Sequence, residues 1–544
     1  MKHHNKTATI FIPVIVSILV IVSFLGGRFS ANTEVTRVVS NASRSNMLSA
    51  SKFGYILNLI DKKYVDAVNV DTLSEEYIEK MLHKLDPHSA YIPAVDAVEN
   101  QEQLEGHFDG IGIMFNMATD TIIVQSVIAG GPADSMGMLP GDRIIIIDDS
   151  LVAGRKINQN EVVKMLKGPG GSTVTIKVER SGNDSLFSLD IVRGKIAIKS
   201  IDAAYMVAPK VGYIKLLQFS RTTHTEFIKA VEELKSQGME KLIFDLTANS
   251  GGYLDQAILI ANEFLPEGKL IVYTEGRKSR LAEQYSDGTG RFQSQDLVVM
   301  IDETSASSSE IVAGALQDND RGTIIGRRSF GKGLVQQSIP LSDGSIVNIT
   351  IARYHTPTGR SIQRPYDKGY DQYYSDFIER YKRMELLYKD SIKLVDSLKY
   401  TTPNGKIVYG GGGIMPDVFV PLDTTIYTSG VVKVFNDNTL LKYALEFTDK
   451  NRGELIEITT LEELKSYFEK NGDAIYNGFV KFARSRKKSV NPSAKEKATI
   501  KNYLFAYISR NSGADDNGFY LYFNNLDNIF QEALKIHLDS ESIN

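Results

Sequence analysis

Short apolar runs alternate with amphipathic segments between residues 194 and 423. Strands are expected at the apolar runs 212–217, 241–246, 269–273 and 297–301, and helices at 225–234 and 254–265. Alternation of this kind is typical of a layered α/β domain. A charged, helix-leaning stretch at about 371–400 interrupts the pattern, and we expect it to form a solvated arm or lid.

A different pattern marks residues 107–193, where runs with strand character are separated by turn residues. Strands are expected at 111–115, 121–127, 143–147, 173–179 and 188–192, with one short helix at 161–166. Glycine and proline form the turns, in Gly131-Pro132 and Pro140-Gly141. We therefore predict a compact, β-rich domain before the α/β domain.

The N-terminal segment has a composition that suits a membrane. Residues 9–26 contain no charged side chain, and at about 18 residues they barely span a bilayer core. Lys2 and Lys6 precede this run while Arg28 alone follows it closely, so we expect the N-terminus in the cytoplasm. The prediction is an uncleaved anchor within residues 1–28 and a linker at 29–50. The rest of the chain would then lie outside the membrane.

The two remaining regions lean towards helix. Within residues 51–106, Phe53, Ile56, Leu57 and Ile60 recur at helical spacing, which is typical of amphipathic helices. Residues 424–544 are polar and helix-leaning, and they contain no motif that suggests a chemistry. This C-terminal extension could serve a homodimer or an activating partner.

Composition excludes several classes of function. The 544 residues carry a net charge of −4 without a basic block, which argues against nucleic-acid binding. The chain has no cysteine, so disulfide frameworks and thiolate metal sites are excluded. The eight histidines form no H-E-x-x-H pair, which makes a zinc hydrolase improbable. We expect neither a metal nor another cofactor.

Ser307 and Lys332 are the candidate chemical groups. Ser307 lies between the apolar run 297–301 and a predicted helix at 311–316, where a helix N-terminus carries partial positive charge that favours an oxyanion. Lys332 begins a second predicted strand, and a buried lysine can lose its proton and act as the base for a serine. The spacing of Ser307 and Glu310 also fits a capping box, in which the serine has a purely structural role.

A second motif overlaps Lys332. The stretch from Gly326 to Lys332 has the G-x-x-x-x-G-K spacing of a phosphate-binding loop. That loop requires serine or threonine next to hold magnesium, and this chain has Gly333. We therefore set the nucleotide-binding interpretation aside.

The β-rich region resembles a PDZ domain, a module that clamps the C-terminal carboxylate of a peptide. The resemblance rests on Gly110-Ile111-Gly112-Ile113, on Gly131-Pro132-Ala133 and on Pro140-Gly141-Asp142-Arg143-Ile144. The resemblance implies that backbone amides of Gly110, Ile111, Gly112 and Ile113 bind a peptide carboxylate, beside a strand edge that accepts the peptide. Otherwise the glycines simply form a hairpin turn.

From about residue 64 to 421, the chain resembles the C-terminal processing peptidases, which are PDZ-containing serine–lysine endopeptidases. The motifs that carry this resemblance are Leu85-Asp86-Pro87-His88-Ser89-Ala90-Tyr91, Ser305-Ala306-Ser307-Ser308-Ser309-Glu310-Ile311, Gly331-Lys332-Gly333-Leu334-Val335-Gln336, Tyr354-His355-Thr356-Pro357-Thr358-Gly359-Arg360-Ser361-Ile362-Gln363 and Gly410-Gly411-Gly412-Gly413-Ile414-Met415-Pro416-Asp417. The fold it implies is an α/β protease core of the crotonase and Clp-protease-like layered type with an inserted PDZ domain. Composition adds to this core the N-terminal transmembrane helix and the helical C-terminal extension.

The resemblance also implies roles for individual residues. Ser307 matches the nucleophile, Lys332 the general base and Gln336 the residue that orients the lysine. Backbone amides of Gly251, Gly252 and Ser308 would form the oxyanion hole. Asp318 matches an acidic position, which we interpret as structural because a charge beside the lysine would raise its pKa.

One loop departs from the family pattern. Asp-Leu-Arg-x-Asn-Pro-Gly-Gly is usual, whereas this chain has Thr247 and Ser250 in place of the arginine and the proline. Two hypotheses result. The first is an endopeptidase anchored in the bacterial inner membrane, with its catalytic part in the periplasm, that binds the C-terminal tails of protein substrates. The second is an inactive PDZ scaffold on a peptidase fold.

Overall fold

The computed structural model describes residues 52–117, 120–128, 130–180, 183, 185–425, 428–436, 438–488 and 493–539. The predicted anchor at 9–26 lies outside these ranges and stays a prediction. Within the described ranges, no helix is both long enough and apolar enough to span a bilayer. The chain divides into two compact units, residues 1–81 and 82–544.

The first unit contains the expected helices. Residues 52–63 are helical, and α2 begins at Val70 and ends at Leu82. The periodic apolar side chains do not form a core, because Phe53 is 45% exposed and Tyr77 is 52% exposed.

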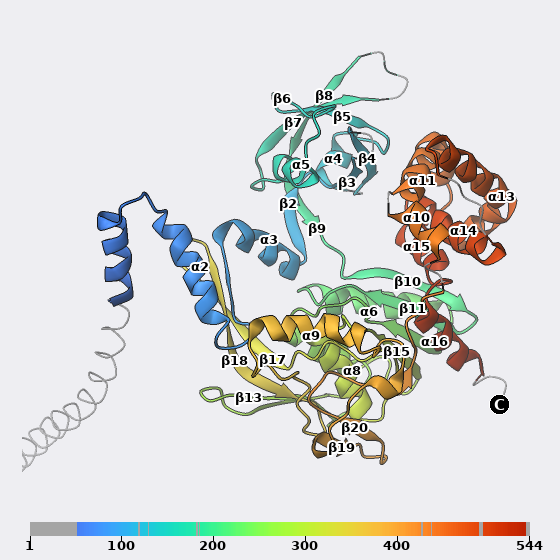
Figure 1. Cartoon of the computed structure of the whole chain (residues 1–544). Helices are drawn as coiled ribbons and strands as arrows, with labels where there is room; N and C mark the ends of the chain where they lie inside the picture. Colours follow the sequence, from blue (N-terminus) through green and yellow to red (C-terminus); the bar gives the residue numbers. More distant parts are fainter. Residues whose placement is uncertain are drawn as a thin grey trace, which may run out of the picture. The chain divides into compact units, whose positions relative to one another are not determined.

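A six-stranded sheet is the centre of the second unit (Figure 1). Its order is β10 (Ile201–Ala208), β11 (Val211–Leu216), β12 (Lys241–Asp245), β15 (Asp296–Ile301), β16 (Thr323–Gly326) and β21 (Val418–Phe419). β10 and β11 are antiparallel, and every other neighbouring pair is parallel. The predicted alternation of strands and helices is therefore the pattern of a largely parallel sheet.

Both faces of this sheet are buried, which explains the uninterrupted apolar runs. Along β15, Leu297, Val299 and Ile301 pack in the core that contains helix residues of α6 (Thr223–Ser236), α7 (Leu254–Asn262) and α8 (Ser308–Asp318). Val298 and Met300, which point to the opposite face, pack in a second core with the C-terminal helices. The C-terminal region thus completes the sheet's second layer.

A second, five-stranded sheet flanks the first. It contains β1 (Ala90–Ile92), β13 (Leu270–Glu275), β14 (Ala282–Tyr285), β17 (Leu334–Pro340) and β18 (Ile346–His355). The run predicted at 269–273 is thus a strand, but it pairs in this smaller sheet. β18 is its longest strand and pairs with β1, β13 and β17.

The β-rich domain agrees closely with the sequence prediction. Its sheet order is β3 (Ile113–Asn116), β4 (Ile122–Val127), β5 (Arg143–Ile147), β7 (Thr173–Glu179) and β8 (Phe187–Val192), with β6 (Ser150–Leu151) beside β5. α5 spans Gln159–Leu166. Pro132, expected in a turn, begins the short helix α4 (Pro132–Ser135). The paired strands β2 (His107–Gly110) and β9 (Gly194–Ala197) lead into and out of the domain.

The insertion and the C-terminal region are helical to different extents. α9 covers only Tyr370–Lys382, and two 3-10 turns follow at Lys389–Ser391 and Asp396–Leu398. α9 is solvated on one face only: Tyr373 is 3% exposed and Arg380 1% exposed, whereas Ile378 is 59% exposed. In the C-terminal region the structure describes α10 (Ser429–Phe435), α11 (Thr439–Lys450), α12 (Arg452–Ile456), α13 (Leu461–Ser485), α14 (Ala494–Ser509), α15 (Asp515–Phe523) and α16 (Asn528–Asp539).

Candidate active site

Three loops follow neighbouring parallel strands of the central sheet. Residues 246–252 follow β12, residues 302–307 follow β15, and residues 327–333 follow β16. The carboxyl ends of parallel strands lie at one edge of a sheet, which is where such folds bind their ligands. This edge therefore collects the predicted oxyanion glycines, Ser307 and Lys332.

Ser307 precedes α8 in a strained conformation. Its φ and ψ are 54° and −112°, a region that costs a residue with a side chain about 1–3 kcal/mol. Of the capping box predicted from the spacing, the bond from Ser307 N to the Glu310 carboxylate is present at 2.9 Å, whereas the Ser307 side chain makes no cap hydrogen bond. Capping therefore accounts for the backbone contact at the start of α8. It does not explain why a serine occupies this strained position.

The carboxylate of Glu310 ties the two candidate residues together. It accepts hydrogen bonds from Ser307 N at 2.9 Å, Lys332 N at 2.8 Å and Gly331 N at 2.7 Å. Ser329 Oγ donates to the same carboxylate at 2.5 Å. Glu310 is fully buried, and burial raises its pKa although these donors lower it. One side chain thus holds both backbones, a role that the sequence suggested only as a helix cap.

Lys332 lies in an environment that favours its neutral form. Burial lowers the pKa of Lys332 below 10.5, while Glu310 and Asp86 raise it by their charge. Within the described part of the chain, no carboxylate forms an ion pair with Lys332. His88 is close enough for Lys332 to affect its titration: burial, and then the charge of Lys332, lower the pKa of His88 to about 3. A lysine with a depressed pKa in such a place is a candidate general base.

β18 and α9 support the loop that contains Lys332. Tyr354, on β18, donates its hydroxyl hydrogen to Lys332 O at 2.5 Å, and its hydroxyl oxygen lies 3.3 Å from Ser307 O. Gly333 N donates to Gln363 Oε1 at 2.8 Å. Tyr373 of α9 lies 3.5 Å from Gly331 O through its hydroxyl. Tyr354 and Tyr373 therefore belong to the site, and neither has a signal in the sequence beyond its place in a family-like stretch or in an insertion.

Two glycines shape the loop after β12. Gly251 has φ +107°, and a Cβ added there would lie 2.8 Å from Ser307 Cβ and 3.0 Å from Ser308 N. Gly252 has φ +145°, and its added Cβ would lie 2.1 Å from Phe219 O. Only glycine fits such positions. The loop therefore runs directly against the candidate nucleophile.

The amides of this loop differ in availability. Gly251 N donates to Asn249 Oδ1 at 2.9 Å, which commits it to the loop itself. Across the described residues, no acceptor is hydrogen-bonded to the N–H of Gly252 or of Ser308. Of the three predicted oxyanion amides, these two are free to bind an oxyanion, and Gly251 serves the loop's shape.

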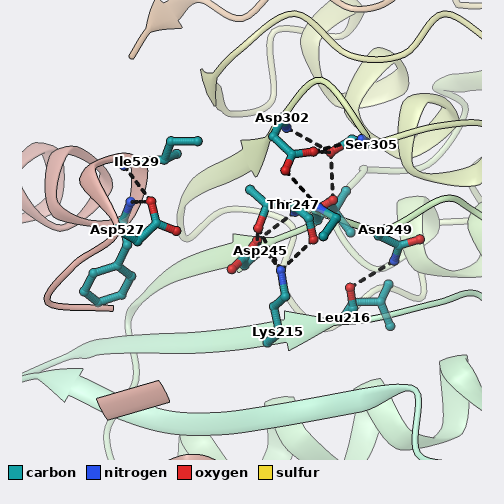
Figure 2. Close-up of polar contacts among 12 residues, drawn as sticks. Lys215, Leu216, Asp245, Thr247, Asn249, Asp302, Ser305, Asp527 and Ile529 are labelled. Atoms are coloured by element: carbon teal, nitrogen blue, oxygen red, sulfur yellow. Dashed lines mark hydrogen bonds and ion pairs between the residues drawn. The ribbon is translucent and has the colours of Figure 1, made fainter. Parts of the chain in front are cut away.

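A polar network that includes Thr247 supports the loop (Figure 2). Lys215 Nζ donates to Asp245 Oδ1 at 3.0 Å and to Thr247 O at 2.6 Å. Thr247 N donates to Asp245 Oδ1 at 2.8 Å, and Ala248 N donates to Asp302 Oδ2 at 3.1 Å. Thr247 is thus integrated into the loop, so its presence in place of the arginine does not by itself indicate a collapsed site.

Gln336 lies on β17, which begins at Leu334, so Lys332 precedes the strand. The pairing of β17 with β18 shifts register between Val335 and Gln336, and the extra residue at this shift lies on β18. Gln336 Nε2 donates to Thr350 Oγ1 at 3.1 Å.

Asp318 is part of a buried ion pair away from the lysine. Its carboxylate accepts from Arg360 Nη2 at 2.7 Å and from Thr358 Oγ1 at 2.7 Å, and both side chains of the ion pair are fully buried. The charges that affect the pKa of Lys332 are those of Glu310 and Asp86. These contacts agree with the structural role inferred for Asp318.

The predicted carboxylate-binding loop joins β2 to β3. It contains Gly110, Ile111, Gly112 and Ile113, and Gly112 has φ +80°. β3 stands at the end of the sheet order, and among the described strands its sheet partner is β4. The other edge of β3 can therefore accept an added strand, as PDZ-type recognition requires.

Comparisons with known proteins agree with this architecture. The model of peptidase family S41 matches residues 210–369, that of the PDZ domain matches 110–191, and that of a family of unknown function (DUF8443) matches 431–512. Over 351 residues the chain is 36% identical to the carboxy-terminal-processing protease of Bartonella bacilliformis, covering 63% of this chain and 80% of that protein. It is 34% identical over 309 residues to the carboxy-terminal processing protease CtpB of Bacillus subtilis, covering 56% of this chain and 64% of that protein.

Among solved structures, the photosystem II D1 C-terminal processing protease is 25% identical with a TM-score of 0.34, covering 69% of this chain and 88% of that one. Fold, site and relatives together define a serine-type peptidase that carries a PDZ domain. The chain belongs to the carboxy-terminal-processing proteases, the family that its sequence motifs indicated.

Proposed function

We propose that this protein is an endopeptidase that captures the C-terminal tails of protein substrates in its PDZ domain and cleaves them at Ser307. Ser307 is the nucleophile, Lys332 the general base and Gln336 the residue that orients the lysine. The observation that carries the proposal is the hydrogen bonding of Glu310 to the backbone of both Ser307 and Lys332.

The reaction has two stages, formation of an acyl-enzyme and its hydrolysis. Lys332 Nζ takes the Ser307 hydroxyl proton as Oγ bonds to the peptide carbonyl, and the amides of Gly252 and Ser308 stabilise the oxyanion. Lys332 then gives that proton to the leaving amine as the C–N bond breaks. Water next donates a proton to Lys332 and attacks the acyl carbon, and the proton returns to Ser307 as the ester bond breaks.

A place in the cell envelope forms part of the proposal. The uncharged run 9–26 and the two lysines before it support an anchor in the bacterial inner membrane, with the peptidase in the periplasm. Protease accessibility of the folded domain in spheroplasts tests this placement. Protection from externally added protease would contradict it.

The scaffold hypothesis rests on Thr247 and Ser250 alone. Loss of an oxyanion donor typically costs about 10²–10³ in turnover, so a distorted loop would explain an inactive relative. Here Asn249 Nδ2 donates to Leu216 O at 3.0 Å, and Asn249 O accepts from Ala306 N at 3.0 Å. These bonds hold the loop against the nucleophile turn, which favours the enzyme.

Cleavage should depend on the substrate's tail. Purified full-length protein in detergent is incubated with an unfolded protein that ends in an apolar tail, and the products are identified by mass spectrometry. We expect cleavage of the free-carboxylate substrate and much slower cleavage of the same substrate with an amidated C-terminus, because the PDZ loop binds the carboxylate. Binding of the tail without any cleavage would favour the scaffold instead.

The pH dependence of cleavage should reflect the ionisation of the general base, Lys332. Only neutral Lys332 accepts the serine proton, so kcat/KM rises with pH through the pKa of Lys332 in the free enzyme. Since burial lowers that pKa, the midpoint of this rise is expected below 10.5. His88 does not produce the rise, because its pKa is about 3. A profile still rising with a midpoint at or above 10.5, in a protein that circular dichroism shows to be folded, would contradict the assignment.

A further inference from the structure

We propose that Asp86, Ser89 and Thr350 form a hydrogen-bond relay that sets which end of the Gln336 amide faces Lys332. The proposal rests on the proposed function, because it assumes that Gln336 orients the lysine. It adds three positioning residues, two of which come from a segment about 250 positions away in sequence.

The relay begins at a buried carboxylate. Asp86 is 7% exposed and accepts from Ser89 N at 2.8 Å, from His88 N at 2.8 Å and from Ser89 Oγ at 2.6 Å. Charge-assisted bonds of this length are among the strong ones in proteins. The single hydroxyl hydrogen of Ser89 is therefore committed to Asp86.

The direction of the next step follows from that commitment. Ser89 Oγ accepts from Thr350 N at 3.1 Å and lies 3.4 Å from Thr350 Oγ1. Because the Ser89 hydrogen is already used, the hydrogen of this second contact comes from the Thr350 hydroxyl. Thr350 Oγ1 then has only lone pairs to offer elsewhere, and it accepts from Gln336 Nε2 at 3.1 Å.

Fixing the amino end of Gln336 on Thr350 leaves its carbonyl end for the lysine. A carbonyl accepts an N–H of the neutral amine or of the ammonium, and it leaves the amine lone pair free for the serine proton. The opposite orientation would present N–H donors, which would bind that lone pair and block the base. The relay therefore selects the orientation in which Lys332 can act.

The charged groups near Lys332 are engaged by other partners. Glu310 is engaged with three backbone amides and one serine hydroxyl. His88 Nε2 is 2.9 Å from the hydroxyl of Tyr373, and Arg364 stacks on the Tyr373 ring with 4.3 Å to its centroid. In this environment the amide of Gln336 is a neutral partner, whereas a carboxylate would raise the pKa of the lysine.

The test compares Thr350→Val, which removes the hydroxyl at nearly constant volume, with the rescue variant Thr350→Ser. Ser89→Ala interrupts the relay at a second point and covers the case in which Thr350→Val fails to fold. Ser338→Ala is the matched control, because Ser338 Oγ donates to Asn348 Oδ1 at 2.6 Å on the same strand pair but at an exposed position. All variants are made in the full-length protein.

Two readouts separate positioning from stability. Steady-state cleavage gives kcat and KM, and competitive acetylation with acetic anhydride across pH, followed by mass spectrometry, gives the pKa of Lys332 without turnover. In Thr350→Val and Ser89→Ala we expect kcat to fall by up to about 10²-fold with KM nearly unchanged. The pKa of Lys332 should also fall, because the carbonyl that stabilised the ammonium is no longer held towards it.

Thr350→Ser should restore both kcat and the pKa of Lys332, and Ser338→Ala should match the wild type in both. The relay is overturned if Thr350→Val keeps the wild-type pKa of Lys332, or if Thr350→Ser is as impaired as Thr350→Val. A wild-type protein that cleaves nothing would refute the proposed function. The acetylation readout would still decide whether the relay sets the pKa of Lys332.

Discussion

Replacing Ser307 by alanine is expected to abolish cleavage while leaving tail binding intact. Removal of the nucleophile in a serine peptidase costs about 10⁶ in kcat, because the acyl-enzyme can no longer form. Lys332→Ala should cost a similar factor, since the serine is not deprotonated without its base. The two losses should not add in the double variant, because both side chains act in one step.

The measurement is mass spectrometry of the products, with tail binding followed by fluorescence anisotropy. Ser236→Ala is a suitable control, since this serine lies at the end of α6 and its hydroxyl donates locally to Glu233 O. Retained cleavage in Ser307→Ala would refute the nucleophile assignment. Loss of both cleavage and tail binding would point to misfolding, which the melting temperature of the variant would reveal.

Gly251→Ala should also lower turnover strongly, although it removes no functional group. The added Cβ would lie 2.8 Å from Ser307 Cβ and 2.9 Å from Ala306 O, so either the loop or the nucleophile turn must move. Displacing the oxyanion amides should lower kcat by about 10²–10³, with a smaller effect on KM. Steady-state kinetics and thermal unfolding, measured on the same samples, give the two effects separately.

The control variant Gly268→Ala separates the effect of the steric clash from the effect of backbone strain. Gly268 has φ +77°, also in the left-handed region, but an added Cβ there has no heavy atom within 4 Å. Both variants should lose about 1 kcal/mol of stability from the unfavourable φ. Only Gly251→Ala should lose turnover. Equal losses of kcat would mean that the loop after β12 is not part of the oxyanion site.

Much of the fold was predictable because local patterns agree with it. The strands at 143–147 and 173–179 have the predicted bounds, since each combines β-branched residues with flanking turn residues. Predictions of which segments are exposed to solvent were less accurate. α9 was expected in solvent from its charge, yet Tyr373 and Arg380 are buried, because a helix that is polar in composition can still bury one face.

At the candidate site, too, features with a local sequence signal were predictable and features set by packing were not. Ser307 and Lys332 could be proposed from sequence, since a serine at a strand–helix turn and a family-like glycine–lysine motif are local signals. The position of Gln336 relative to Lys332 was not predictable in this way, because Lys332 precedes β17 and the pairing of β17 with β18 shifts register at Gln336. The contacts that α9 makes with the site had no local signal, and residues 86–89 were marked only as part of a family-like motif.

The sequence by itself determined the order of strands and helices, the chemistry available and the family. Only the tertiary structure decided which groups act on one another. Parallel pairing of β12, β15 and β16 brings three distant loops to one sheet edge, and the buried carboxylate of Glu310 then joins two of them. Burial likewise sets the pKa of Lys332, because desolvation depends on the atoms packed around the amine and not on its neighbours in the chain.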